Sequence, residues 1–316
     1  MRRIFKLLIL FIVMFSLVGC SNVFSPDKSK ENATHILTDA VGKKVTLPLK
    51  PKRIVSLNLG TDELIMDLVS PDRITALSYI ADDPGISHIA ERSKSVKNKI
   101  KDYNAESILA MKPDLIIIAD WWNLNTLQTL RDLGLNVYVY KTPYNLEDIK
   151  KTIREVAFVV GEKEKGEAIV AEYEKILLAA KNRVESFAKK NKRSVLAITN
   201  HGAFGGKGSL YDDMCAYIEV ENCMKDIPQK GNQTISKEVI VEKNPDVIIS
   251  VAWDHPGMAK SKTTQEIIND PALKTIKAVK NKNVRLISAK SLYCVSHYSA
   301  IGVDLLARAV YPEAYD

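Results

Sequence analysis

Cysteine and histidine are scarce in this chain, and their scarcity argues against several kinds of site. The 316 residues include 4 cysteines and 5 histidines, and no two cysteines form a C-x-x-C pair. A structural zinc site is therefore not expected. A bare zinc or manganese ion needs converging histidine and carboxylate ligands, but the histidines are scattered at His35, His88, His201, His255 and His297. We expect no metal site of the protein's own and no cofactor.

Motifs of common enzyme classes are also absent. The glycine-rich segment from His201 to Ser209 lacks the G-x-x-x-x-G-K-[ST] spacing of a phosphate loop, so we interpret it as a loop after a strand. Neither G-x-S-x-G nor H-E-x-x-H occurs. No nucleophile motif therefore supports the alternative of an extracytoplasmic enzyme, and we expect a protein without enzymatic activity.

The sequence has no strong excess of charge of one sign. The formal net charge is +7, and it falls to about +4 without residues 1–19, which contain three basic residues and no acidic residue. The basic residues are dispersed and are not interleaved with aromatic residues. We therefore expect no binding of nucleic acid.

The N-terminal segment is apolar but short. Arg2, Arg3 and Lys6 precede an apolar run over residues 7–18, which Gly19-Cys20 follows. This pattern is typical of a secretory signal peptide, and the run is shorter than the roughly 20 residues of a transmembrane helix. A cysteine directly after the cut site resembles the bacterial lipobox, in which that cysteine receives lipid. We expect residues 1–19 to be a lipoprotein signal peptide and Cys20 to be lipidated, an ordinary signal peptide being the alternative.

The remaining chain is predicted to contain two α/β lobes. After a flexible polar tether over residues 20–34, residues 35–48 predict a β-hairpin. Strand and helix patterns then alternate up to residue 160 and again over residues 192–316. Such alternation indicates βαβ units on mainly parallel sheets. We expect an N-terminal lobe over residues 35–160 and a C-terminal lobe over residues 192–316.

Between these lobes, residues 161–191 predict one long helix. From Ile169 to Phe187 the apolar residues recur at spacings of three and four, and the other positions are charged or polar. This periodicity is typical of a helix with one buried face. No glycine or proline interrupts the segment after Gly166. We expect a stiff helix that bridges the lobes.

An internal repeat supports two similar lobes. Residues 106–121 and 238–253 match at an offset of 132 positions, from a glutamate through Pro-Asp and an apolar run to a tryptophan. In each copy a short helix begins at a capping residue, and Pro-Asp ends it before a buried strand. Helix, Pro-Asp and strand also form a common βα device, which is the alternative explanation.

Three segments carry a resemblance to a known family. They are residues 51–57, the Asn-x-Glu to Lys-Pro-Asp-Leu-Ile-Ile block, and residues 273–284. Together they resemble the solute-binding proteins of ABC importers for iron chelates and cobalamin, over most of residues 35–316. The resemblance implies two Rossmann-like lobes bridged by one long α-helix, with the ligand between them. It also implies a monomer, tethered by lipid outside the membrane, that delivers its ligand to an ABC permease dimer with a cytoplasmic ATPase.

The same resemblance suggests a role for Glu106 and Glu238, because a glutamate at this place in each lobe of the family docks on permease arginines. The alternative is that an acidic residue in a first helical turn only complements the helix dipole.

Candidate ligand contacts follow from the rule that pockets gather at the carboxyl ends of parallel strands and from the resemblance. They are Asn58, Leu59, Gly60, Tyr79, Trp121, Trp122, His201, Phe204, Trp253, Tyr293, His297 and Tyr298. Large rings with a few polar tips suit a bulky metal chelate or a tetrapyrrole.

The charge of the ligand is constrained by the arginines. None of Arg73, Arg92, Arg131 and Arg285 falls on a predicted cleft loop, whereas anionic chelates usually require arginine. We expect an iron(III)-siderophore type of chelate that is uncharged, with cobalamin or another corrinoid, or haem, as alternatives. A surface adhesin on the same scaffold is a further alternative.

Overall fold

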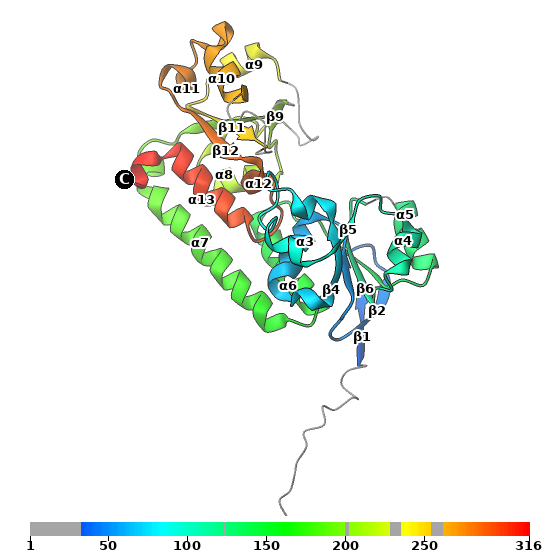
Figure 1. Ribbon diagram of the computed structural model, residues 1–316. Helices are drawn as coiled ribbons and strands as arrows, with labels where there is room; N and C mark the ends of the chain where they lie inside the picture. Colours follow the sequence, from blue (N-terminus) through cyan, green and yellow to red (C-terminus); the bar gives the residue numbers. More distant parts are fainter. Residues whose placement is uncertain (1–32, 123, 200–201, 228–234, 254–261) are drawn as a thin grey trace, which may run out of the picture. The chain divides into compact units, whose positions relative to one another are not determined.

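The computed structural model describes residues 33–122, 124–199, 202–227, 235–253 and 262–316 (Figure 1). Thr34–Asp316 form one compact unit, to which the following account applies. The signal peptide, Cys20, most of the tether, His201 and His255 lie outside the described residues. None of the helices in the described ranges has the length and apolar character needed to cross a membrane.

The predicted hairpin is confirmed. Strands β1 (Thr34–Thr38) and β2 (Lys44–Pro48) pair antiparallel. Asp39 closes the turn, because its Oδ1 accepts hydrogen bonds from the backbone N–H groups of Val41 and Lys43.

The first large sheet has five parallel strands, in the order β5-β4-β3-β6-β7. Their apolar runs are almost wholly buried, as expected of parallel strands covered on both faces. The strands are β3 (Ile54–Ser56), β4 (Ile74–Ser78), β5 (Asn98–Ile100), β6 (Leu115–Ala119) and β7 (Val137–Tyr140). The associated helices are α3 (Leu59–Leu68), η1 (Pro71–Arg73), η2 (Tyr79–Asp82), η3 (Arg92–Ser95), α4 (Ala105–Ala110), α5 (Leu124–Asp132) and α6 (Leu146–Val159).

The second large sheet follows the order β10-β8-β11-β12. Strand β9 pairs antiparallel with the last three residues of β8, 197–199. Its strands are β8 (Ser194–Thr199), β9 (Gly202–Phe204), β10 (Glu221–Asn222), β11 (Val247–Ala252) and β12 (Val284–Ser288). Its helices are α8 (Leu210–Tyr217), α9 (Lys237–Lys243), α10 (Lys262–Asn269), η4 (Pro271–Leu273), α11 (Lys277–Lys280), α12 (Ala289–Leu292), α13 (Ser299–Val310) and η5 (Pro312–Ala314).

The repeat seen in the sequence has a structural counterpart in the two sheets. The order β4-β3-β6-β7 corresponds to β10-β8-β11-β12, and the repeated Pro-Asp precedes β6 and β11. Asp114 accepts hydrogen bonds from the backbone N–H groups of Lys52 and Arg53, just before β3. Asp246 accepts one from the N–H of Ser194 at the start of β8. Each aspartate therefore fixes the register of two neighbouring parallel strands.

A single helix of 28 residues, α7 (Lys163–Lys190), connects the two sheets. It packs against α6 before it and α13 after it, and Figure 1 shows α7 in green alongside α13 in red. Its buried face includes Val170, Tyr173 and Leu177, and the Tyr173 hydroxyl lies 3.0 Å from Ser299 Oγ on α13. The α/β fold with a long bridging helix is thus confirmed.

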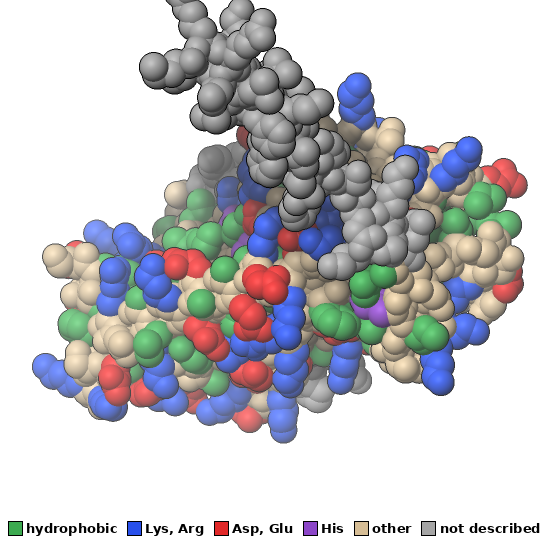
Figure 2. Space-filling model, turned by 90° about the horizontal axis from the view of Figure 1, so that it is seen from below, with side chains coloured by type: hydrophobic (Ala, Val, Ile, Leu, Met, Phe, Trp, Pro, Cys, Tyr) green, Lys and Arg blue, Asp and Glu red, His purple; other side chains and the backbone are tan. Residues whose placement is uncertain are grey.

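We call residues 34–162 the N-terminal half and residues 191–316 the C-terminal half. The finer domain limits proposed from the sequence stay a prediction, because both halves belong to one compact unit. The surface charge is mixed: on the face in Figure 2, acidic and basic side chains are interspersed instead of separated into patches of one sign.

Candidate functional site

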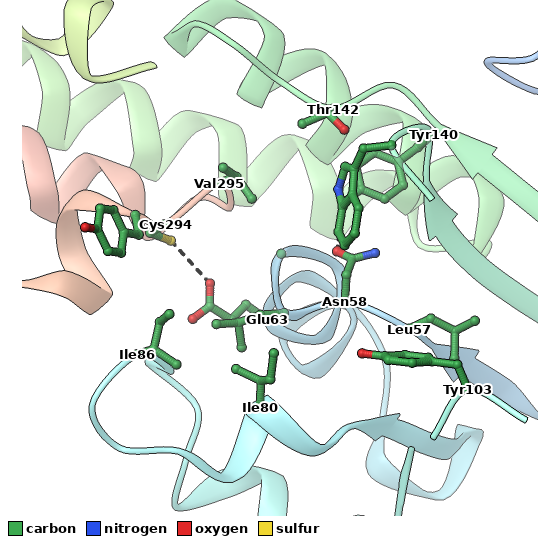
Figure 3. Close-up of a pocket in the computed structure, with 14 residues that line it drawn as sticks. Leu57, Asn58, Glu63, Ile80, Ile86, Tyr103, Tyr140, Thr142, Cys294 and Val295 are labelled. Atoms are coloured by element: carbon green, nitrogen blue, oxygen red, sulfur yellow. Dashed lines mark hydrogen bonds between the residues drawn. The ribbon is translucent and has the colours of Figure 1, made fainter. Parts of the chain in front are cut away.

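A cavity of about 220 Å³ lies where the two halves meet (Figure 3). Most of its wall comes from segments that follow strands of the first sheet, and residues 293–295 of the C-terminal half complete it. Its lining is Leu57, Asn58, Leu59, Gly60, Glu63, Ile80, Ile86, Tyr103, Trp121, Tyr140, Thr142, Tyr293, Cys294 and Val295.

The N-terminus of α3 forms one wall of this cavity. Asn58 caps the helix, since its Oδ1 accepts a hydrogen bond of 3.2 Å from the Thr61 N–H and one of 2.8 Å from the Tyr140 hydroxyl. The helix begins at Leu59, because the Asn58 side chain satisfies a first-turn N–H. Asn58 is 8% exposed, and its Nδ2 has no hydrogen-bond partner among the residues that the structure describes.

Gly60 allows the two halves to approach closely at this wall. A Cβ atom on Gly60 would lie 2.9 Å from Val295 Cγ2 and 3.7 Å from the Tyr140 hydroxyl oxygen. Real Cβ atoms rarely come nearer than about 3 Å to other atoms, so any larger residue would displace Val295. The sequence alone does not show why position 60 is a glycine. The structure does, because Val295 of the C-terminal half leaves no room there for a side chain.

Glu63 is a buried carboxylate that connects the halves. Its Oε2 accepts hydrogen bonds from Ser296 Oγ at 2.5 Å and from Cys294 Sγ at 3.3 Å, and its Oε1 accepts one from the His88 N–H at 2.9 Å. Figure 3 shows the bond between Cys294 and Glu63 across the cavity wall. Burial raises the pKa of Glu63, and these hydrogen bonds partly oppose that rise.

One helical turn later, Asp67 holds the same C-terminal segment. His297 Nε2 lies 2.8 Å from Asp67 Oδ2, the Tyr298 hydroxyl donates to that oxygen at 2.7 Å, and Arg92 donates to Oδ1 at 2.5 Å. Burial opposes ionisation of Asp67, but the hydrogen bonds from His297, Tyr298 and Arg92 outweigh it and lower the pKa to about 2. His297 and Tyr298 are thus directed at α3 and are not part of the cavity lining.

Five of the residues predicted as ligand contacts line the cavity: Asn58, Leu59, Gly60, Trp121 and Tyr293. His201 lies outside the described residues. The structure does not bring the other candidates into this lining, and their roles as contacts stay predictions. They are Tyr79, Trp122, Phe204, Trp253, His297 and Tyr298.

The positions of these other candidates differ in kind. The Trp122 ring lies edge-on to Tyr103, with ring centroids 4.3 Å apart, and stacks on Trp121, so it contacts two residues of the lining. Trp253 Nε1 donates to Asp83 Oδ2 at 3.3 Å, which joins the C-terminal half to the N-terminal half outside the lining.

Several lining residues were not predicted from the sequence. Tyr140 is the last residue of β7, Thr142 follows that strand, and Tyr103 follows β5. The carboxyl-end rule would have identified all three had it been applied to every strand of the sheet. Glu63 and Val295 gave no such signal, because their place in the wall depends on contact between distant segments.

The described lining contains no lysine, arginine or histidine. The arginines considered in the sequence are engaged elsewhere: Arg73 pairs with Glu162 and Arg131 with Asp39. Within the described residues, no group of three or more His, Cys, Asp or Glu side chains could hold a metal ion. Cys215, Cys223 and Cys294 are free thiols. Because the described lining carries no cationic side chain, the cavity suits a ligand without strong negative charge.

A family model described as periplasmic binding protein matches residues 54–290. The chain belongs to this family. Among curated relatives it is 26% identical to the iron(3+)-hydroxamate-binding protein YxeB of Bacillus subtilis, covering 90% of this chain and 88% of that one. It is 24% identical to the uncharacterized ABC transporter substrate-binding lipoprotein YvrC of Bacillus subtilis, covering 97% and 96%.

Solved structures of periplasmic binding proteins share this fold. Molybdate-bound MolA of Haemophilus influenzae has a TM-score of 0.74 at 21% identity, covering 89% of this chain and 92% of that one. The heme-binding protein RhuT of Roseiflexus has a TM-score of 0.70 at 23% identity, covering 83% and 99%. The solutes in these names differ, so the family alone does not identify the ligand.

The two candidate docking residues of this periplasmic binding protein occupy equivalent places. Glu106 lies in the first turn of α4, which Asn104 caps, and Glu238 lies in the first turn of α9, which Ser236 caps. Both side chains are exposed. Each is therefore accessible to a partner, one in each half.

Proposed function

We propose that this protein is the solute-binding lipoprotein of an ABC importer and captures an iron(III) chelate of the siderophore type. The observation that carries the proposal is a cavity lined by both halves of the chain, since a ligand held there contacts both at once. Relatives whose names include iron(3+)-hydroxamate binding and siderophore binding support the chelate class. Cobalamin, which occurs in the name of another relative, and haem are the alternatives.

The charge of the cavity favours an uncharged chelate. An anionic ligand loses its hydration when it enters the cavity, and the described lining offers no cationic side chain to replace that hydration. It would also come near the buried carboxyl of Glu63. Hydroxamate chelates of iron(III) are neutral when three hydroxamates bind one ion, and they present oxygen acceptors to Asn58 Nδ2 and to the hydroxyl of Tyr103.

Capture involves limited movement of the halves. Helix α7 packs on a helix from each half, and Glu63 and Asp67 hold the segment 294–298 on α3. These contacts restrict closure to a small hinge or shear motion around the ligand. The protein binds and releases its solute without changing it.

The ligand is tested on protein purified from its native host, by absorption spectrum and mass of the copurified compound. Tryptophan fluorescence then measures Kd for ferrichrome, which is a neutral ferric trihydroxamate, and for haem, cobalamin and molybdate. We expect ferrichrome to bind at least tenfold more tightly than molybdate and to be recovered unchanged. Tightest binding of haem or cobalamin would select the alternative, and tightest binding of molybdate would refute an uncharged ligand.

We propose that Glu106 and Glu238 dock on arginines of the permease dimer. Charge pairs of this kind set orientation and encounter rate more than affinity. The double substitution Glu106→Lys and Glu238→Lys is expected to abolish uptake of the bound chelate but to leave its Kd within twofold. Glu164→Lys is the control, because Glu164 is also exposed in a first helical turn. Normal uptake by the double variant would refute the docking role.

We propose that Cys20 carries the lipid that tethers the protein outside the membrane. Cys20→Ala is expected to move the protein from the membrane fraction to the soluble fraction without changing Kd. Membrane retention of this variant would refute lipidation at Cys20.

A further inference from the structure

The N-terminal hairpin exposes a large apolar side chain. Ile36 lies in the middle of β1, opposite Thr46 of β2, and it is 67% exposed. None of the other large apolar side chains in the described ranges is more exposed. The alternate positions of β2 point inward, where Val45 and Leu47 are buried. The hairpin is therefore well packed on its inner face, and the exposure of Ile36 belongs to its outward face.

Two more exposed apolar side chains lie at the ends of the hairpin. Val41 in the turn and Leu49 directly after β2 are each 43% exposed. Leu49 and Lys50 lie against Gly161, since a Cβ there would come within 2.2 Å of the Leu49 carbonyl oxygen and 2.9 Å of Lys50 Cγ. Apolar surface is thus presented along the hairpin from its turn to its base.

Lysines accompany these apolar side chains. Residues 40–53 contain four lysines and one arginine but no acidic residue. Lys43, Lys44 and Lys50 are exposed. The antiparallel register places Lys44 on the same outward face as Ile36. The hairpin therefore combines positive charge with apolar surface. We call the following residues the hairpin surface: Ile36, Val41, Lys43, Lys44, Leu49 and Lys50.

The acidic side chains that contact this segment are engaged elsewhere. Asp39, in the turn, is buried and pairs with Arg131. Asp114 accepts hydrogen bonds from the backbone N–H groups of Lys52 and Arg53. Neither carboxylate extends to the outward face, so the positive charge of the hairpin surface is available to an anionic partner.

The hairpin is also the point at which the predicted tether joins the body. Cys20 and Thr34, the first residue of β1, are 14 positions apart. A flexible chain of that length has a root-mean-square span of about 20 Å. When Cys20 carries lipid, chain connectivity therefore keeps the hairpin close to the membrane. Tethering over such a distance gives effective concentrations in the millimolar range, so a weak contact is sufficient there.

We propose that the hairpin surface rests on the anionic lipid headgroups of the membrane to which Cys20 tethers the protein. This inference rests on the proposed lipid anchor and goes beyond it, because it assigns a second, weaker contact with the membrane. Each lysine near a negative membrane surface strengthens binding about fivefold. Exposed apolar side chains such as Ile36 enter the boundary between headgroups and acyl chains. The contact fixes which side of the tethered body faces the membrane.

The test uses the Cys20→Ala protein, so that no lipid contributes, and measures cosedimentation with an excess of vesicles. We expect binding to vesicles of phosphatidylcholine mixed with phosphatidylglycerol at low salt, release at high salt, and no binding to phosphatidylcholine alone. Joint substitution by Lys43→Glu, Lys44→Glu and Lys50→Glu is expected to weaken this binding at least tenfold. Ile36→Ser is expected to weaken it at least fivefold.

Matched controls carry the same changes elsewhere. Lys274→Glu, Lys280→Glu and Lys282→Glu together change the charge by the same amount at exposed lysines of the C-terminal half. Leu178→Ser removes a leucine of α7 that is 54% exposed. Both controls are expected to bind within threefold of the parent protein. All the substituted side chains are exposed, so the variants are expected to fold, and circular dichroism checks this.

Equal binding to neutral and anionic vesicles, or equal losses in the hairpin and control variants, would overturn the role of the hairpin surface. Absence of vesicle binding would also overturn it, and it would leave the lipid anchor intact because Cys20 is replaced in this experiment. The anchor is judged separately by fractionation of cells that produce Cys20→Ala. At physiological salt the hairpin surface alone is too weak to retain that variant with the membranes.

Discussion

Substitution of Asp67 by asparagine tests the contact between α3 and the segment that ends the cavity wall. Asp67 accepts hydrogen bonds from three donors, His297, Tyr298 and Arg92. An asparagine offers one acceptor oxygen and one NH₂ group, so at least one of these donors would face another donor. Two of the donors belong to the C-terminal half, so the variant weakens the attachment of one half to the other.

The expected loss of stability follows from these bonds. Hydrogen bonds to a charged group contribute about 1.5 to 3 kcal/mol each when net effects are measured. The three bonds share one partly exposed carboxylate, whose side chain is 21% exposed, so we expect a total loss of about 2 to 3 kcal/mol at pH 7.

The loss depends on pH in a defined direction. The folded-state pKa of Asp67 is about 2, below its ordinary value of 3.8. Stability from the carboxylate is therefore fully present above pH 4 and disappears as the pH falls toward 2. The difference in pKa corresponds to about 2 kcal/mol, and solvent screening reduces this to about 1 to 2 kcal/mol.

Urea unfolding followed by circular dichroism at pH 7, 5, 3.5 and 2.5 measures the effect. The gap between the unfolding midpoints of wild type and Asp67→Asn should be widest at pH 7 and 5 and should narrow below pH 4. Asp72→Asn, at an exposed aspartate, serves as the control and should show no such trend. A constant gap from pH 7 to 2.5, or no gap at pH 7, would show that Asp67 does not stabilise the protein as a carboxylate.

Three further predictions concern other buried groups. Burial raises the pKa of Asp62 to about 8, against hydrogen bonds from Ser56 and Ser78, so the wild type should lose stability as the pH rises from 4 to 8. Asp62→Asn should lose less stability over this range, because the raised pKa of Glu63 remains, and equal slopes of unfolding midpoint against pH for the two proteins would contradict this. Gly302→Ala should lower stability by about 1 to 3 kcal/mol, because its Cβ would lie 2.2 Å from the carbonyl oxygen of Ser291; an unchanged melting temperature would disprove the close approach of α13 to α12. The three described cysteines are free and buried, and burial raises the pKa of each thiol; they are Cys215, Cys223 and Cys294. They should react with a thiol reagent only in urea. Immediate reaction in buffer would show that one of them is accessible.

The strands that the sequence predicted well are the buried parallel ones. Strands such as Ile74–Ser78 and Ser194–Thr199 leave a nearly continuous apolar run in the sequence, because most of their positions are buried. The missed strands are short and lie at sheet edges or pair outside the main order. The Asn98–Ile100 strand is partly exposed and contains a lysine, so no apolar pattern marks it.

The position of the site was predictable in outline. Asn58, Leu59 and Gly60 follow the strand β3, and a pocket at the carboxyl ends of parallel strands follows from topology. The rule gives an edge of the sheet but no side-chain direction. His297 and Tyr298 were placed in the right segment, yet they turn toward Asp67, because a carboxylate on α3 accepts their hydrogen bonds.

Periodicity and the repeat in the chain define two similar α/β halves and the 28-residue helix between them, since burial of one helix face and of whole strands leaves a regular trace in the order of residues. Contacts between segments more than 200 positions apart leave no such trace. Only the packed structure therefore shows that Glu63 receives Cys294 and Ser296 and that Val295 rests on Gly60.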